Sequence, residues 1–326
     1  MTTTPRTTVT PVSVIIPTCR RPEQLLESVA SALASDYPDF EVIVVDDSGP
    51  CPERERTEQR LRPLLARHAN LRYLQHPERR NGSAARNTGI RAARGGYLMF
   101  LDDDDLFLPG KMAAQAGFLD AHDSTWGACY TRYTDRRDGR TVSRSGETRQ
   151  GWLLREELAR NLFLHAGSNL MVRREVVEAL GGFDESFVRN QDMEFMVRLL
   201  KGWQLGFVDV AGLVVNLHPR PGVRMLEVTR QFLDKFRPDI QALPEEEQRM
   251  VLRMLALQQI RAVLSERSDP RSCRALMREH GLRMPDVLRY FAHLLRRRVT
   301  GVTCGYSLER LRDRGKRTEI KKKGRA

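Results

Sequence analysis

The first hundred residues alternate short apolar runs with stretches of helical periodicity. The apolar runs are rich in Val, Ile and Leu, as strands buried on both faces are. They cover residues 12–16, 40–45, 71–74 and 97–101. Apolar side chains recur at helical spacing in 22–33 and 53–68, and 82–93 is typical of a loop that enters a helix. This order predicts an α/β fold with a mixed, mostly parallel sheet and helices on both faces.

The rest of the chain divides into a second part of the sheet and a purely helical region. Strands are expected over 127–132, 168–172 and 205–215, helices after 109 and over 192–200, and a loop or hairpin over 136–151. Further helices are expected over 226–264 and 287–299. We therefore expect a disordered lead-in at 1–10, an α/β domain at 11–223, a helical C-terminal region at 224–300 and a basic tail at 301–326.

Acidic residues follow two of the predicted strands at the point where each ends. Asp46 and Asp47 come after the second run, and Asp102–Asp105 comes directly after the fourth. In sheets of this kind, ligands bind outside the carboxyl ends of the strands. Adjacent carboxylates repel one another unless a cation lies among them, and Mg²⁺ and Mn²⁺ share such oxygens with substrate phosphates. The acidic run therefore predicts a metal–diphosphate site; the alternative is a solvated acidic turn.

Two further motifs near this edge admit both a binding role and a structural one. The Asp47 carboxylate can accept hydrogen bonds from a nucleotide base or ribose, or it can cap a turn or helix. The stretch 79–89 is rich in small residues and Arg. Small residues let a backbone approach a ligand and Arg pairs with phosphate, although the spacing is not that of a P-loop. The alternative for this stretch is a helix N-terminus with surface arginines.

Six motifs occur in a fixed order along the chain. They are Val-Ser-Val-Ile-Ile-Pro-Thr, Val-Val-Asp-Asp-Ser, Asn-Gly-Ser-Ala-Ala-Arg-Asn-Thr-Gly-Ile, Phe-Leu-Asp-Asp-Asp-Asp, Gly-Gly-Phe-Asp-Glu and Asn-Gln-Asp-Met-Glu-Phe. Each motif alone is weak, but together and in this order they resemble the inverting family 2 glycosyltransferases, which have the GT-A fold. The resemblance covers about residues 10–221, some two thirds of the chain.

The resemblance implies a nucleotide-sugar donor and a pocket that binds it. Pro17 and Thr18 are implied to border the base, and Asp47 to hydrogen-bond the base or ribose. Asp103 is implied to lie near the ribose, and Arg86 to line the pocket. Because UDP is the commonest nucleotide in the family, a UDP-sugar is favoured.

The resemblance also implies a divalent metal, Mn²⁺ or Mg²⁺, as cofactor. Asp102 and Asp104 fill the family's Asp-X-Asp pattern, and Asp104 is implied to be the direct ligand. His218 follows the last predicted strand, near the position where some relatives bind metal through a histidine. The alternative for a lone histidine is a structural or exposed side chain.

The implied catalytic base is Asp192, in the first turn of a predicted helix. The family usually has Glu before this Asp, and this chain has Gln191 instead. Asn190 is expected to cap the helix, whose dipole favours a charged carboxylate at this end. Glu194 is the rival base, and a structural first-turn Asp is the alternative. The resemblance implies a single displacement, in which the base takes the proton of the attacking acceptor hydroxyl.

Basic residues concentrate near the C-terminus. The chain has a formal net charge of +12, and residues 283–326 hold 14 Lys/Arg and 4 Asp/Glu, a net of +10. An apolar helix at 287–299 next to Arg296–Arg298 and Lys321–Lys323 predicts peripheral contact with an anionic membrane. The alternative is a helical cap followed by a solvated tail. Five scattered cysteines without a CxxC pair favour a reducing compartment.

The expected function is metal-dependent transfer of a sugar to a hydroxyl of a saccharide or lipid-linked acceptor, in polysaccharide, glycolipid or glycoconjugate synthesis. We expect a cytoplasmic protein, attached peripherally to the inner face of the membrane if the basic region binds lipid. A nucleotidyltransferase is one alternative, although the first turn has no Gly-rich phosphate loop. A basic nucleic-acid-binding protein is another, disfavoured because the charge lies in a tail without aromatic interleaving. A donor-binding but inactive relative is the third.

Overall fold

The structure is a computed structural model, and it describes residues 9–218, 225–266 and 269–312. The chain divides into two compact units, one of residues 1–153 with 164–219 and one of 154–163 with 220–326. We call them the α/β unit and the helical unit. Most of the expected lead-in and tail, including Lys321–Lys323, and the expected domain boundary near residue 224 lie outside the described residues.

The α/β unit is built on a mixed sheet in which strands are ordered β7-β6-β8-β4-β1-β2-β3, with β9 beside β6 and β5 beside β9. The strands are β1 (Val12–Thr18), β2 (Phe40–Asp46), β3 (Leu71–Gln75), β4 (Tyr97–Phe100), β5 (Leu106–Phe107), β6 (Trp126–Arg137), β7 (Arg140–Ser145), β8 (Met171–Arg173) and β9 (Gln204–Asn216). Strands β4, β1, β2 and β3 are parallel to one another. The predicted mixed, mostly parallel α/β sheet flanked by helices is therefore confirmed.

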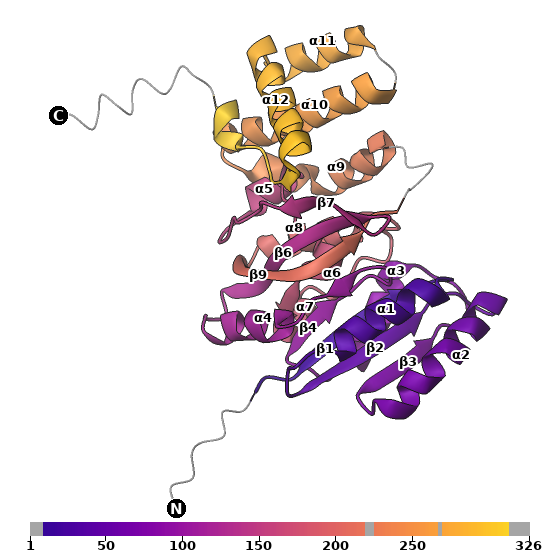
Figure 1. Cartoon of the computed structure of the whole chain (residues 1–326). Helices are drawn as coiled ribbons and strands as arrows, with labels where there is room; N and C mark the ends of the chain where they lie inside the picture. The colour runs from indigo at the N-terminus through magenta and orange to yellow at the C-terminus, as the bar shows by residue number, and fades with distance from the viewer. Residues whose placement is uncertain (1–8, 219–224, 267–268, 313–326) are drawn as a thin grey trace, which may run out of the picture. The chain divides into compact units, whose positions relative to one another are not determined.

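Helices cover both faces of the parallel part of the sheet (Figure 1). Those of the α/β unit are α1 (Pro22–Leu33), α2 (Pro52–Arg67), α3 (Gly82–Ala92), α4 (Lys111–Asp120), α6 (Ala166–Asn169), α7 (Arg174–Ala179) and α8 (Gln191–Leu200). Alternate residues of β2 point to opposite faces: Val42 and Val44 belong to the core that holds Leu25 of α1, whereas Ile43 packs with Ala85 of α3. This alternation is why the strands read as continuous apolar runs.

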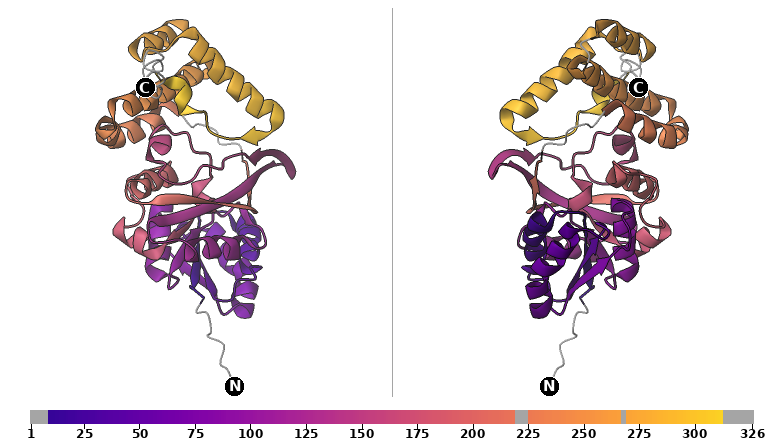
Figure 2. Two further views of the ribbon diagram at one scale, coloured as in Figure 1. Left: turned by 90° about the vertical axis from the view of Figure 1, so that its left-hand side faces the viewer. Right: turned by 90° about the vertical axis from the view of Figure 1, so that its right-hand side faces the viewer.

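Two long strands return the chain to the edge where β1 and β4 end. Strands β6 and β9 run parallel and side by side (Figure 2). The hairpin expected in 136–151 is present, because β6 turns into β7 at Asp138 and Gly139, which both have positive φ as a two-residue hairpin turn requires. The strand expected over 168–172 is wrong in its first part: α6 occupies Ala166–Asn169, and β8 is antiparallel to β4.

The helical unit combines one short internal segment with the C-terminal helices. Its elements are α5 (Leu154–Leu158), α9 (Met225–Ala242), α10 (Glu245–Glu266), α11 (Pro270–Glu279), α12 (Met284–Thr300), β10 (Val302–Thr303) and the 3-10 helix η1 (Leu308–Leu311). The Asn161 side chain donates to the Tyr306 carbonyl at 2.6 Å and accepts from its N–H at 2.8 Å. Among the helices described, none is long and apolar enough to cross a bilayer.

Candidate active site

The acidic run Asp102–Asp105 lies in the turn that follows β4, at the carboxyl edge of the parallel strands. Asp103, Asp104 and Asp105 are buried, with exposed fractions of 6%, 8% and 4%. Buried carboxylates need positive or hydrogen-bonding partners. The interpretation as a solvated acidic turn is therefore disfavoured. The groups that contact each carboxylate show which of them remains available to a ligand.

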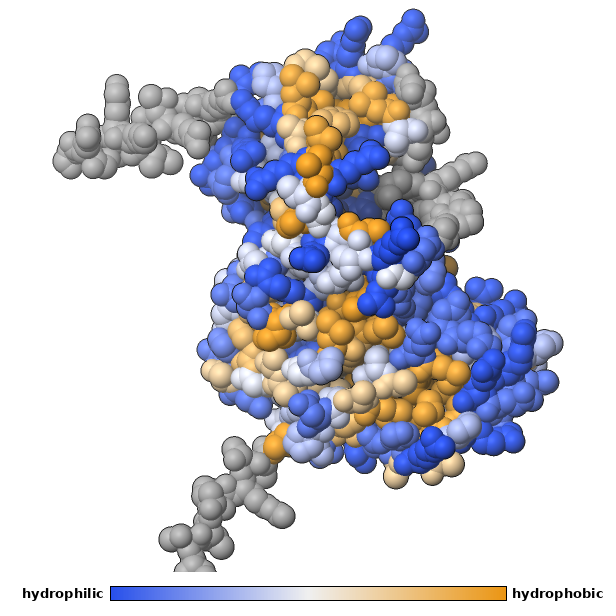
Figure 3. Space-filling model, viewed as in Figure 1, coloured by the Kyte–Doolittle hydropathy of each residue, from blue (hydrophilic) through white to orange (hydrophobic). Residues whose placement is uncertain are grey.

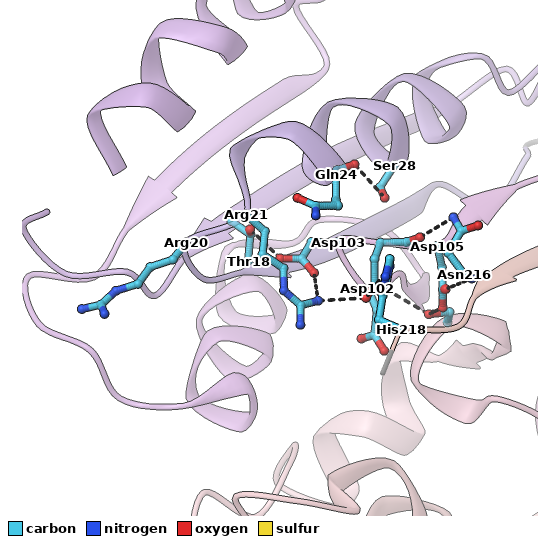
Figure 4. Close-up of polar contacts among 12 residues, drawn as sticks. Thr18, Arg20, Arg21, Gln24, Ser28, Asp102, Asp103, Asp105, Asn216 and His218 are labelled. Atoms are coloured by element: carbon cyan, nitrogen blue, oxygen red, sulfur yellow. Dashed lines mark hydrogen bonds and ion pairs between the residues drawn. The ribbon is translucent and has the colours of Figure 1, made fainter. Parts of the chain in front are cut away.

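Arg21, in the turn after β1, faces two of these carboxylates. Its Nη1 lies 3.1 Å from Asp103 Oδ1 and 2.8 Å from Asp104 Oδ2. Thr18 at the end of β1 donates its hydroxyl to Asp103 Oδ2 at 2.7 Å, and Figure 4 shows both side chains turned toward Asp103. Burial raises the pKa of Asp103 to about 6, although Arg21 and the Thr18 hydroxyl act in the opposite direction. Asp103 is thus fixed in place by the first strand.

Asp105 is held by residues of α6 and β9. The Ser168 hydroxyl donates to Asp105 Oδ2 at 2.6 Å, and the Asn216 N–H donates to Oδ1 at 3.0 Å. The Asn216 amide also donates to the Asp104 carbonyl at 2.6 Å. Burial and the neighbouring Asp102 raise the pKa of Asp105. Both oxygens of Asp105 are engaged by protein groups, so this residue shapes the turn.

Arg86 of α3 joins the acidic turn to the start of α8. Its Nη2 donates to Asp102 Oδ1 at 2.5 Å, and its Nη1 donates to Gln191 Oε1 at 3.0 Å. The guanidinium also lies over the Phe183 ring, 5.4 Å from its centroid. Arg86 is itself buried, with 6% exposed. Gly167 approaches Asp102 closely, since a Cβ added there would lie 3.1 Å from Oδ2.

His218, beyond the end of β9, comes to the same turn. Its Nε2 lies 3.7 Å from Asp104 Oδ2, and its side chain is 46% exposed; Figure 4 shows it beside the acidic residues. Among the residues that the structure describes, no three His, Cys, Asp or Glu side chains are grouped as a metal centre. Asp104 and His218 nevertheless bring a carboxylate and an imidazole together from distant segments.

Asp47 occupies a buried position at the end of β2. Its carboxylate lies 2.7 Å from His76 Nδ1 and accepts from the Arg80 N–H at 2.8 Å, both through Oδ1. The Asp47 N–H donates to the carbonyl of Thr18 at 2.8 Å. The Asp47 side chain therefore does not close the turn after β2. The Asp46 side chain does so, because it accepts from the Ser48 N–H at 2.8 Å.

Asp192 and Glu194 both lie in the first turn of α8 and have different surroundings. Glu194 is fully buried. Arg198 forms a bidentate ion pair with it, in which Nε and Nη2 lie 2.6 Å and 2.7 Å from the two carboxylate oxygens. Asp192 is partly exposed. Asn190 stands at the N-cap position, as expected, but its side chain makes no capping hydrogen bond. Of the two carboxylates, only Asp192 is open to a substrate.

The structure brings most of the predicted residues to one edge of the sheet. Pro17, Thr18, Asp47 and Asp102–Asp104 lie at or beyond strand ends, and Arg86 and His218 reach the acidic turn. The sequence reasoning missed Arg21 and His76. Both stand just after the carboxyl end of a parallel strand, and that position was the available signal.

Comparisons with known proteins show which sequences this chain resembles. Residues 13–181 match the sequence family described as "Glycosyl transferase family 2". An uncharacterized glycosyltransferase of Rickettsia felis is 35% identical over 111 residues, which is 34% of this chain and only 17% of that protein. Glycosyltransferase AglE of Haloferax volcanii is 28% identical over 224 residues, 66% of this chain and 69% of that protein.

Solved structures share the fold. TarS residues 1–349 of S. aureus, in complex with UDP-GlcNAc, superimposes with a TM-score of 0.62 at 18% identity over 83% of this chain and 80% of that one. The mannosyltransferase PcManGT of Pyrobaculum calidifontis, in complex with GDP-Man and Mn²⁺, gives a TM-score of 0.56 at 20% identity over 89% and 81%. The predicted GT-A fold with a helical C-terminal extension is thereby confirmed.

Proposed function

We propose that this chain, which belongs to glycosyl transferase family 2, transfers a sugar from a nucleotide-diphosphate-sugar to an acceptor hydroxyl with inversion at the anomeric carbon. The observation that carries the proposal is the bridge made by Arg86, which contacts Asp102 of the acidic turn and Gln191 beside Asp192. The bridge ties the proposed donor site to the proposed base. Membership of this family also favours glycosyl transfer over the nucleotidyltransferase alternative.

The donor pocket is proposed to form at the ends of β1 and β2. Pro17 and Thr18 border the base, Asp47 receives hydrogen bonds from the base or ribose, and Asp103 lies near the ribose. Arg86 faces the diphosphate, since a guanidinium pairs with phosphate in a fork. UDP is favoured as the nucleotide. The structurally similar TarS and PcManGT bind UDP-GlcNAc and GDP-Man, which supports a nucleotide-sugar without selecting one.

A divalent cation is proposed to bind at the acidic turn, where Asp104 Oδ2 and His218 Nε2 lie 3.7 Å apart. Asp104, His218 and Asp102 would hold it, through carboxylate oxygens and one imidazole nitrogen. Oxygen ligands suit both Mg²⁺ and Mn²⁺, and PcManGT contains Mn²⁺. When bound, the ion supplies positive charge that stabilises the leaving diphosphate. Arg21, which lies 2.8 Å from Asp104 Oδ2, balances the same carboxylate charge from the protein side.

Asp192 is proposed to act as the general base. Its carboxylate takes the proton of the acceptor hydroxyl as that oxygen bonds to the anomeric carbon, and the bond from this carbon to the diphosphate oxygen breaks with its electron pair. Arg86 stabilises the charge that grows on the leaving group. The acceptor is proposed to be a saccharide or a lipid-linked saccharide.

Ligand-dependent stabilisation tests the donor site. A ligand that binds only the folded state raises the melting temperature, so the chain should be melted with UDP, GDP, TDP and CDP, each with and without Mn²⁺. We expect one nucleotide to act in a Mn²⁺-dependent way, most strongly UDP. Asp104→Ala should abolish the shift, whereas Asp36→Ala, at an exposed position, should retain it. No shift with any nucleotide would refute the donor site.

A further inference from the structure

Helix α12 carries an apolar stripe that the described helical unit leaves uncovered. One face of the helix packs inward through Val287 and Tyr290, which are 7% and 3% exposed. A second face of the helix exposes large apolar side chains at helical spacing. They are Met284 (56% exposed), Leu288 (62%), Leu295 (62%) and Val299 (77%). Scattered exposed apolar residues are ordinary, but a continuous stripe on one helix face indicates contact with another apolar phase.

A basic hollow borders this stripe. It has a volume of about 390 Å³ and is lined by three arginines, Arg289, Arg296 and Arg310. His293 and residues 304–307, which follow β10, complete its wall. No Asp or Glu lies in its wall, as far as residues 269–312 are described. Arg289 shares its charge with Asp286 at 3.3 Å. Arg296 and Arg310 are exposed.

The hollow and the stripe are two sides of one surface. Ala292 lines the hollow, and its position in α12 falls between Leu288 and Leu295 on the stripe. Because residues three and four apart share a helix face, Arg289 and Arg296 flank one side of the stripe and Arg298 flanks the other. In Figure 3, hydrophobic residues gather along the face that α12 turns to the viewer, with hydrophilic ones beside them.

We propose that this surface lies on an anionic membrane, with a lipid phosphate in the arginine hollow and the stripe in the apolar boundary beneath the headgroups. Arginine binds phosphate in a planar fork and remains charged at every relevant pH. Helices with an apolar face flanked by basic residues lie in the interfacial plane of a bilayer. A soluble phosphate ligand would account for the hollow alone, and a partner protein for the stripe alone; a phospholipid accounts for both.

The test is sedimentation of the full chain with vesicles of phosphatidylcholine, and with vesicles of equal parts phosphatidylcholine and phosphatidylglycerol. We expect binding only to the anionic vesicles, weakened by salt because the Debye length shrinks to about 3 Å at 1 M. Arg296→Gln with Arg310→Gln should weaken partitioning by roughly 30-fold, from the usual contribution of a basic residue near an anionic surface. Leu288→Ser with Leu295→Ser should also weaken it, with an unchanged circular dichroism spectrum.

The matched control is Arg271→Gln with Arg274→Gln, which removes the same charge from exposed positions on α11 and should retain binding. Equal loss in both arginine pairs would show diffuse attraction and overturn the proposed site. The membrane proposal is wrong if the wild-type protein does not bind the vesicles. If glycerol 1-phosphate then raises its melting temperature, and Arg296→Gln with Arg310→Gln removes that rise, the ligand is a soluble phosphate. None of these measurements depends on sugar transfer, so they stand apart from the test of the donor site.

Discussion

The guanidinium of Arg86 lies 3.0 Å from the side-chain oxygen of Gln191, at the position where family members usually have glutamate. A neutral amide accepts this hydrogen bond without taking the positive charge, so Arg86 keeps its ion pair with Asp102. The hydrogen bond to Gln191 therefore joins α3 to α8, while the charge of Arg86 stays paired with Asp102 in the acidic turn.

Replacement of Arg86 should impair turnover. Arg86→Gln removes a buried cation that faces the proposed diphosphate, and loss of one such stabilising group lowers turnover by roughly 100-fold. The measurement is release of nucleoside diphosphate from the donor selected by the melting experiment. Arg91→Gln, an exposed position on the same helix, should retain the wild-type rate. Equal rates in both variants would remove Arg86 from the donor site.

Replacement of the two acidic residues at the start of α8 should affect different properties, activity for Asp192 and stability for Glu194. Asp192→Asn should lower transfer by roughly 10²–10⁴-fold, as expected for a general base, while nucleotide-dependent stabilisation persists. Glu194→Gln should lower the free energy of unfolding by about 3 kcal/mol, because Arg198 loses a buried ionic partner. Urea unfolding and transfer rates on both variants separate the roles. A stable, inactive Glu194→Gln beside an active Asp192→Asn would reverse the assignment.

A methyl group at position 167 should disturb the acidic turn. In Gly167→Ala the new carbon would lie 3.1 Å from Asp102 Oδ2, so the carboxylate must shift relative to Arg86. We expect a weaker Mn²⁺-dependent nucleotide shift in the melting temperature. Gly117→Ala is the control, because a Cβ at this exposed position of α4 meets nothing within 4 Å. It should keep the shift and gain up to about 1 kcal/mol in stability.

Stability should rise with pH because of Lys111. The residue is only 1% exposed, and burial lowers the pKa of its ammonium group from 10.5 to about 7. Between these values the unfolded chain holds a proton that the folded chain does not, so unfolding becomes harder as pH rises. From pH 7 to pH 9 this lysine should add roughly 2 kcal/mol to the free energy of unfolding.

Urea unfolding of wild type and Lys111→Met at pH 7 and pH 9 measures this contribution. The wild-type gain should exceed the gain of the variant, since methionine does not titrate. Parallel pH profiles in the two proteins would show that Lys111 stays protonated in the fold, held by Asn169 Oδ1 at 2.7 Å and Thr131 Oγ1 at 3.1 Å.

The parallel strands and the acidic turn could be predicted because their signals are local. A strand buried on both faces is a continuous apolar run, and the carboxylates follow it directly. The strand over 168–172 was partly wrong because Asn169 acts through distant partners. Its side chain donates to the carbonyls of Thr131 and Leu164 at 2.7 Å and 2.8 Å, which fixes a helical turn where the apolar pattern alone suggests extension.

The charge partners of the site could not be predicted for the same reason. Arg21 contacts Asp103 from 82 positions away in the chain. Its position after β1 was a signal, but the adjacent Arg20 shares that position, so the sequence does not single out Arg21. For helix α12, the sequence identified the apolar residues but not which of them are buried. Only the fold separates the buried Tyr290 from the exposed Leu288.

The segment 154–163 has a consequence for dividing this protein by cloning or proteolysis. It interrupts the α/β unit in the chain, yet it belongs with the C-terminal helices, where Gln258 donates to the Ala159 carbonyl at 3.0 Å. A single cut near residue 220 would therefore leave Leu158 and Ala159, both fully buried, behind on the α/β fragment without their cover. Such a fragment should aggregate through these exposed apolar residues. A fragment that stays monomeric should need a polar linker in place of 154–163 as well as the cut.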